Sequence, residues 1–169
     1  VSFRDVNQSD YYYDAVQWAV EKGITEGTSA TTFSPGASCT RAQMVTFLYR
    51  AAGSPAPKST VNPFTDVTAN DYYYNAVLWA VENGITTGVS ADRFAPGVTV
   101  SRAQTVMFLY RANGSPAANG AGFSDVAADE YYANAVAWAV SSGITTGTGN
   151  GKFAPNAPCT RGQIVTFLY

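Results

Sequence analysis

The sequence predicts a mostly α-helical fold, made of three tandem helix-loop-helix repeats that pack together as one domain. Three observations support this fold class. A set of motifs returns three times in one order, apolar residues recur at helical spacing, and each copy contains a capping-box motif that marks a helix start. Two short helices and a loop have too little core to fold alone, so we expect the repeats to share one.

The repeats are defined by motifs at constant spacing. Intervals of 61 and 59 residues separate the tryptophans Trp18, Trp79 and Trp138. We assign repeat 1 to residues 1–53, repeat 2 to 64–114 and repeat 3 to 123–169, which we expect to be truncated at its C-terminal end. The segments 54–63 and 115–122 contain Gly, Pro and Ser and are predicted to be exposed linkers.

The first helix of each repeat is predicted from an apolar stripe. In repeat 1, Tyr12, Ala15, Val16, Ala19 and Val20 follow the spacing of one helix face. A glycine three residues beyond Val20 stands where a helix commonly ends in a left-handed residue. We expect this helix to end just before that glycine.

A loop then leads to Pro35-Gly36, which is Pro155-Asn156 in repeat 3. Because Asn is the residue that most readily replaces Gly at positive φ, we expect the left-handed residue of this turn at Gly36 and Asn156.

The second helix of each repeat is predicted to begin at a capping box. Thr40-Arg41-Ala42-Gln43 returns as Ser101-Arg102-Ala103-Gln104 and as Thr160-Arg161-Gly162-Gln163, each followed by an apolar run. In repeat 1 this helix presents Met44, Phe47, Leu48 and Ala51 on one face and is expected to end at Gly53.

The arginine of this motif lies in the first helical turn, where the positive end of the helix dipole makes a cation mildly unfavourable. Its threefold recurrence suggests an anionic partner for Arg41, Arg102 and Arg161. The alternative is an ion pair with the recurring carboxylates Asp5, Asp66 and Asp125, which would join the repeats.

The composition excludes several functions. The net charge of −2 provides no basic field for nucleic acid, and no apolar run approaches the roughly 20 residues that insert into a membrane. The chain has no His and no calcium-loop motif, so we expect neither a metal site nor a cofactor. Three near-equal copies of one site favour multivalent binding over catalysis, and we do not expect an enzyme.

The two cysteines occupy one repeat position. Cys39 and Cys159 each precede the hydroxyl residue of the capping box, where repeat 2 has Val100. They are either small buried apolar residues or a disulfide that closes a long loop.

Four motifs in a fixed order, Phe-x-Asp-Val, Ala-Val-x-Trp-Ala-Val-x-x-Gly-Ile-Thr-x-Gly, Phe-x-Pro and Thr-Arg-Ala-Gln, closely resemble the S-layer homology domain of bacterial surface proteins. The resemblance implies a monomeric pseudo-threefold spindle with a central three-helix bundle and grooves between the repeats. It also implies a secreted, non-catalytic module that anchors proteins at the bacterial cell wall or S-layer surface. The expected partner is an anionic, commonly pyruvylated, secondary cell-wall polysaccharide.

Carried over by position, the resemblance places Arg41, Arg102 and Arg161 in the grooves, with the recurring Asp beside them and with free helix N–H groups as further donors. Gly27, Gly88 and Gly147 either admit a sugar ring to the backbone or are turn glycines. Trp18, Trp79 and Trp138 either stack on sugar or pack between helices. Gln replaces the usual Glu of the family motif, which removes negative charge from the site. The rival interpretation is a protein interaction or self-assembly scaffold that uses the same grooves.

Overall fold

The computed structural model describes residues 3–59, 61–118, 122–127, 129–145 and 147–169, and this part of the chain contains six α-helices and no sheet. Each repeat contributes two helices: α1 (Tyr13–Glu21) and α2 (Arg41–Ala51), α3 (Tyr74–Glu82) and α4 (Arg102–Ala112), and α5 (Ala133–Ser141) and α6 (Arg161–Leu168). The predicted mostly helical fold is confirmed. The predicted linkers 54–63 and 115–122 include residues 60 and 119–121, which lie outside the described residues.

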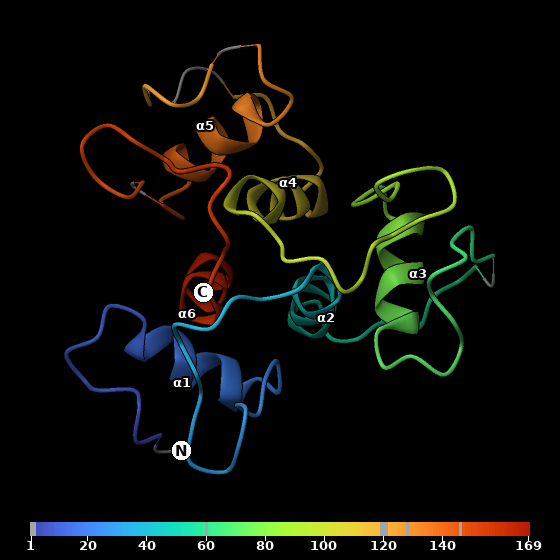
Figure 1. The fold of residues 1–169 in the computed structure, drawn as a ribbon, viewed down its shortest axis with the longest axis horizontal. Coiled ribbons are helices and arrows are strands. Elements are labelled where there is room, and N and C mark those ends of the chain that lie inside the picture. Colours follow the sequence, from blue (N-terminus) through green and yellow to red (C-terminus); the bar gives the residue numbers. More distant parts are fainter. Residues whose placement is uncertain (1–2, 60, 119–121, 128, 146) are drawn as a thin grey trace.

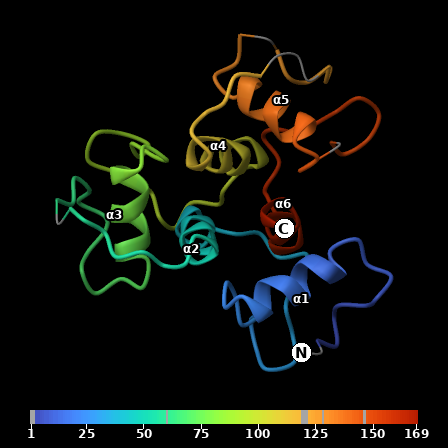
Figure 2. The ribbon, with the colours of Figure 1, turned by 180° about the vertical axis from the view of Figure 1, so that it is seen from behind.

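The second helices of the three repeats lie in the middle of the molecule. Figures 1 and 2 show α2, α4 and α6 there, with α1, α3 and α5 outside them. Each inner helix contacts the other two, and each outer helix packs on an inner helix of another repeat: α3 on α2, α5 on α4 and α1 on α6. The last pair closes a ring, so every repeat is held by both of the others.

All three predicted capping boxes are confirmed. The Gln43 N–H donates to Thr40 Oγ1 at 3.1 Å, and the Thr40 N–H donates to Gln43 Oε1 at 2.8 Å. Ser101 with Gln104 and Thr160 with Gln163 form the same pair of bonds. A cap of this kind stabilises a helix by about 1 kcal/mol.

The extended segments before the inner helices form a closed ring of backbone hydrogen bonds. Cys39 N–H donates to Cys159 O at 3.2 Å, Cys159 N–H to Val100 O at 3.0 Å, and Val100 N–H to Cys39 O at 2.8 Å. Both cysteines are buried free thiols, so the disulfide alternative is not realised. Burial raises the pKa of Cys39 to about 12 and that of Cys159 to about 11, as expected for cysteines that act as small apolar residues.

The N–H groups of the first helical turn are already bonded across repeats. Arg41 N–H donates to Val98 O at 2.9 Å and Ala42 N–H to Pro96 O at 3.1 Å. The other two inner helices repeat these bonds. The expectation of free helix N–H donors for an anion is therefore wrong, because carbonyl groups of the neighbouring repeat occupy them.

The inner helices are buried more widely than one apolar face predicts. In α2, every residue from Arg41 to Leu48 is buried except Gln43, whereas Ala51 is exposed. Ala51 follows the spacing of the predicted face but lies at its exposed end. Burial along α2 is wide because this helix packs against three others, α3, α4 and α6.

Candidate functional site

A recurring aspartate fixes the turn that carries the Phe-x-Pro motif. Asp66 accepts from Phe94 N–H at 2.9 Å and from Ala95 N–H at 2.8 Å. Burial alone would raise the pKa of Asp66, but these two donors hold it below its usual value. Asp5 and Asp125 make the same pair of bonds and show the same pKa direction.

The two bonds stabilise an unusual backbone conformation. Ala95 has φ of 59°, as do Ser34 and Ala154 at the equivalent positions. Gly36 and Asn156 are not among the positive-φ residues, so the predicted position of the left-handed residue was wrong by two residues. A non-glycine residue in this region costs about 1–2 kcal/mol, which hydrogen bonds to a carboxylate offset.

The carbonyl group of the same phenylalanine holds the recurring arginine of the previous repeat. Arg41 Nε–H donates to Phe94 O at 2.9 Å, and its guanidinium carbon lies 4.8 Å from the Phe94 ring centroid and 5.3 Å from that of Phe108. Only 4% of Arg41 is exposed. The cation is thus sandwiched between two aromatic rings of repeat 2.

The arrangement returns around the ring. Arg102 donates to Phe153 O between Phe153 and Phe167, and Arg161 donates to Phe33 O between Phe33 and Phe47. We call these three sets of one Asp, two Phe and one Arg the inner walls. Their arginines join the repeats, as one alternative predicted, but the hydrogen bonds of Asp5, Asp66 and Asp125 go to backbone N–H groups and not to the arginines.

The outer nitrogens of these guanidinium groups remain available to a ligand. Within the described residues, Arg41 and Arg102 donate hydrogen bonds through Nε alone, and Arg161 adds one contact of Nη2 with Thr25 Oγ1 at 3.3 Å. No buried side-chain nitrogen of the described residues lacks a partner, so the unpaired outer nitrogens reach solvent. Burial lowers the pKa of all three guanidinium groups, which nevertheless stay charged at neutral pH.

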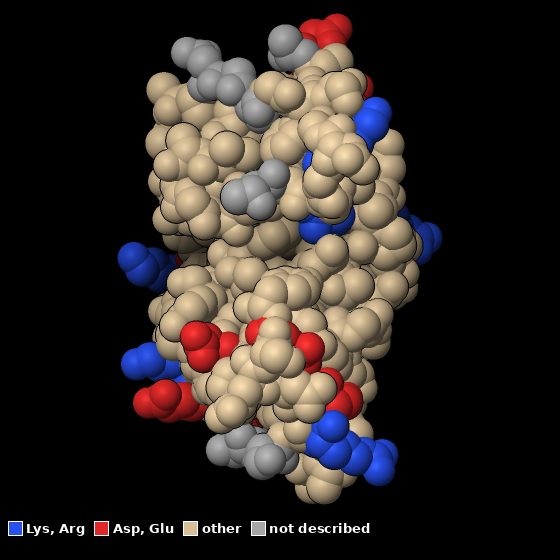
Figure 3. All heavy atoms as spheres, turned by 90° about the vertical axis from the view of Figure 1, so that its left-hand side faces the viewer, with Lys and Arg blue, Asp and Glu red and all other residues tan. Residues whose placement is uncertain are grey.

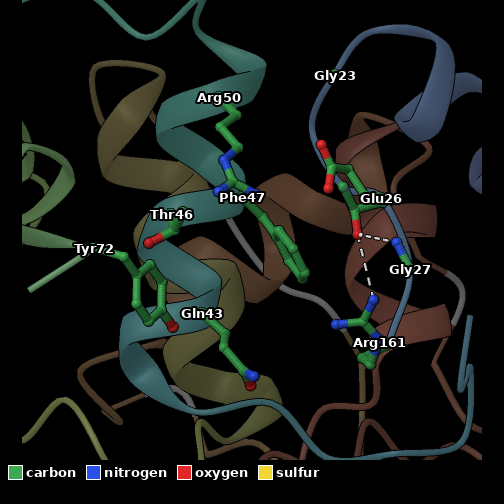
Figure 4. A pocket seen from close by; sticks show the side chains of 10 residues that line it. Gly23, Glu26, Gly27, Gln43, Thr46, Phe47, Arg50, Tyr72 and Arg161 are labelled. Atoms are coloured by element: carbon green, nitrogen blue, oxygen red, sulfur yellow. Dashed lines mark hydrogen bonds between the residues drawn. The ribbon is translucent and has the colours of Figure 1, made fainter. Parts of the chain in front are cut away.

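Each arginine opens into one of three equivalent pockets. Groove 1 lies between residues 23–27 and α2 of repeat 1, and Arg161 of repeat 3 and Tyr72 of repeat 2 complete it. Figure 4 shows this groove, with Phe47 and Gln43 extending from α2 toward the side that carries Glu26 and Arg161. Its volume is about 390 Å³. All three repeats therefore contribute residues to groove 1.

The other two grooves follow the same plan. Groove 2, of about 300 Å³, combines residues 86–89 and α4 with Arg41 and Tyr131. Groove 3, of about 530 Å³, combines residues 143–145 and 147–148 and α6 with Arg102 and Tyr11. The three capping glutamines also line them, one in each groove.

The groove tyrosines were not identified from the sequence. Tyr11, Tyr72 and Tyr131 are 67%, 65% and 67% exposed, although they stand next to tyrosines that are half-buried or buried. The Tyr-Tyr runs contain no pattern that distinguishes the exposed member. The only available indication was the apolar stripe, which begins at the second tyrosine and leaves the first outside it.

The recurring glycines line the grooves but are required by packing behind them. Gly88 has φ of 88°, and a Cβ there would lie 2.4 Å from Phe64 Cε1 and 2.5 Å from Arg93 O. Gly27 and Gly147 have equivalent close neighbours. This geometry fits the turn-glycine alternative and leaves the glycine backbone at the groove wall.

The tryptophans pack between helices. Trp18, Trp79 and Trp138 are half-buried, and their rings lie 5.5–5.7 Å from those of Tyr169, Tyr49 and Tyr110, which lie on the neighbouring inner helix or, for Tyr169, directly after it. Neither they nor the three recurring aspartates line grooves 1–3.

The remaining surface carries few charges. On the face in Figure 3, Lys, Arg, Asp and Glu are scattered over a mostly uncharged surface. Among the described residues, no helix is long and apolar enough to cross a membrane, and no group of three or more His, Cys, Asp or Glu side chains is placed to hold a metal ion.

Known proteins share the recurring motifs of this chain. The model of the S-layer homology domain family matches residues 2–45, 63–106 and 122–165. The Surface-layer 125 kDa protein of Lysinibacillus sphaericus is 35% identical over 161 residues, which are 90% of this chain and 13% of that protein. The S-layer protein of Bacillus thuringiensis subsp. finitimus is 26% identical over 99% of this chain and 21% of its own length.

The chain thus spans about a fifth or less of these relatives. The relatives include an endoglucanase from Bacillus sp. (strain KSM-635), 36% identical over 65% of this chain and 11% of the enzyme. S-layer homology (SLH) domains themselves are non-catalytic modules that anchor S-layer and other surface proteins to the cell wall. With three motif sets, three cross-repeat arginine sites and three family matches, the chain belongs to the S-layer homology family as three tandem SLH domains.

Proposed function

We propose that grooves 1–3 bind an anionic, pyruvylated secondary cell-wall polysaccharide and thereby anchor the parent protein non-covalently to the cell wall. In this proposal the helices form one monomeric pseudo-threefold spindle around the bundle of α2, α4 and α6. The module catalyses no reaction.

The observation that carries the proposal is the state of the three arginines. Each guanidinium group is fixed by its Nε–H bond and by two aromatic rings, while outer nitrogens reach a groove. A cation held in this way loses little conformational entropy on binding a carboxylate, which a guanidinium group can bind through two parallel hydrogen bonds. A pyruvate ketal supplies such a carboxylate.

The groove walls fit the rest of a sugar. Threonine hydroxyls, the side-chain amide of Gln43 and its equivalents, and backbone groups near Gly27 offer hydrogen-bonding partners. Tyr72 and its equivalents offer an exposed aromatic face with a polar edge, a combination suited to a sugar ring. The capping glutamine adds no negative charge where the family motif has Glu.

The proposal is tested by calorimetric titration of wall-polysaccharide fragments into the protein. Fragments with their pyruvyl groups should bind with up to three fragments per chain, and removal of these groups by mild acid should weaken binding at least tenfold. Affinity should also fall as salt is raised, because the interaction is ionic. Equal binding of both fragments, or no binding together with concentration-dependent self-association, would favour the scaffold interpretation instead.

A further inference from the structure

Grooves 1 and 2 have arginines at equivalent positions but differ in net charge. Each contains the buried inner-wall arginine and a second arginine from its own inner helix, Arg50 in groove 1 and Arg111 in groove 2. Groove 1 also contains the exposed carboxylate of Glu26, where groove 2 has Thr87. The lining of groove 2 includes no carboxylate.

The same two grooves differ in polarity. Met107 lines groove 2 at the position where Thr46 lines groove 1. Val89, which is 56% exposed, lines groove 2 at the position of Thr28 in repeat 1. Groove 2 therefore combines two cations with apolar surface, whereas groove 1 combines two cations, one anion and hydroxyl groups.

Figure 4 shows the position of Glu26 in groove 1. Its side chain stands on the loop of groove 1, facing α2 and on the same side of the pocket as Arg161. A bound carboxylate that meets Arg161 would share the pocket, of about 390 Å³, with the Glu26 carboxylate. At a separation of about 6 Å and an effective dielectric constant of about 40, this repulsion changes affinity about tenfold.

We propose that the residue at one repeat position, Glu26 in groove 1 and Thr87 in groove 2, determines which sugar unit each groove accepts. This proposal rests on the function proposed above. Thr87 allows groove 2 to bind the carboxylate-bearing sugar unit, and the methyl group of the pyruvate ketal then lies against Val89 and Met107. Glu26 makes groove 1 prefer a neutral unit of the same polymer. One chain thus binds charged and uncharged units side by side.

A reciprocal exchange tests this assignment in the full chain. The variants are Thr87→Glu and Glu26→Thr, with Glu26→Gln to remove charge at nearly constant size and Glu21→Gln as a charge change outside the grooves. The probes are pyruvylated wall-polysaccharide fragments and the same fragments after pyruvyl removal. The backbone amides of Gly27 and Gly88 line grooves 1 and 2 and donate equivalent bonds to Thr25 and Thr86, so their NMR signals report each groove separately.

In the unaltered chain, the Gly88 signal should titrate at about tenfold lower concentration of pyruvylated fragment than the Gly27 signal. In Thr87→Glu, the concentration of pyruvylated fragment that gives half of the Gly88 shift should rise about tenfold. The corresponding concentration of depyruvylated fragment should not change. Glu26→Thr and Glu26→Gln should both lower the Gly27 midpoint, and Glu21→Gln should change neither. These differences should shrink at 1 M salt, where the screening length is about 3 Å.

Two results would overturn the assignment. One is an equal Gly27 and Gly88 response to the pyruvylated fragment in the unaltered chain. The other is a Thr87→Glu effect of equal size on both fragments, which would indicate a steric cause. If neither glycine responds to either fragment, the function proposed above fails as well, so the two failures are distinguishable.

Discussion

The inner walls and the rims of the grooves differ in how constant their residue types are among the repeats. By rims we mean the residues that line grooves 1–3 but do not belong to an inner wall. Each inner wall has an aspartate, two phenylalanines and an arginine, and these residue types are the same in all three copies. The rims keep the exposed tyrosine and the capping glutamine but change at Glu26 and Thr87 and at Thr46 and Met107. The constant part thus lies behind each groove, and the variable part lies around its opening.

Under the proposed function, this difference separates the residues that hold the repeats together from those that would select a ligand. In the inner wall, the backbone of one residue connects two repeats: the Phe94 N–H donates to Asp66, and the Phe94 carbonyl accepts from Arg41. All three copies form this link, which joins each repeat to the next around the ring. Glu26, Thr46, Thr87 and Met107 each line a single groove, so under the proposed function such a rim residue can vary with the sugar unit bound there.

Loss of an inner-wall carboxylate should have the largest effect. Asp66→Ala removes the acceptor of two N–H groups and the support of the left-handed Ala95, so we expect a loss of about 3–5 kcal/mol in the free energy of unfolding. Urea unfolding followed by circular dichroism measures it. Asp71→Ala is the matched control, since that carboxylate accepts one exposed bond from Thr68 N–H, and we expect a loss of about 1 kcal/mol. Similar losses in the two variants would contradict the special role of Asp66.

The next largest effect is expected behind the glycine of groove 2. Gly88→Ala puts a methyl group against backbone Arg93 O at positive φ and should cost about 2–4 kcal/mol. Gly97→Ala should be nearly neutral, because a Cβ there meets nothing within 4 Å and its φ is not positive. Thermal melts of the two variants provide the comparison, and equal melting temperatures would show that packing behind the groove does not require glycine.

The buried arginine should matter more for stability than the rim arginine. Arg41→Met keeps a flexible apolar chain between Phe94 and Phe108 but loses the bond to Phe94 O, and we expect a loss of about 2 kcal/mol. Arg50→Met loses one bond to Ile24 O from an exposed side chain and should cost less than 1 kcal/mol. Urea unfolding measures both. A larger loss of unfolding free energy in Arg50→Met than in Arg41→Met would show that the rim arginine has the greater structural role.

The smallest expected effect concerns pH. The pKa of Asp66 in the folded protein lies below its ordinary value of 3.8. Its ionised form therefore stabilises the fold above about pH 3.8, and this stability is lost as pH falls through the folded-state pKa. Asp66→Asn should reduce the acid-dependent loss without abolishing it, since Asp5 and Asp125 keep their lowered pKa values. Unfolding free energies measured between pH 5 and pH 2 test this, and identical slopes in variant and parent would contradict it.

The sequence was sufficient for the features that depend on local pattern. The capping boxes, the helix ends before Gly23 and Gly84, and the tandem repeats all follow from spacing within a few residues. It also located the arginines that line the grooves, because Arg41 and its equivalents conflict with the local helix dipole.

The partners of those residues could not be predicted, because they lie in other repeats. Arg161 binds Phe33 O across 128 positions, and Arg41 binds Phe94 O across 53. Near-identical repeats offer each arginine three equivalent phenylalanines, and only the folded ring determines which one it meets. The same uncertainty concealed that Val98 and Pro96 carbonyl groups occupy the helix N–H donors.

We infer that each inner-wall arginine binds a phenylalanine carbonyl of another repeat through Nε and the polysaccharide through its outer nitrogens. Side-chain NMR of ¹⁵N-arginine protein tests it directly during titration with the pyruvylated fragment. We predict that the Nη signals of Arg41, Arg102 and Arg161 shift as the grooves fill, while their Nε signals, bonded to the phenylalanine carbonyls, stay nearly constant. Saturation of binding with no movement of these Nη signals would contradict the claim.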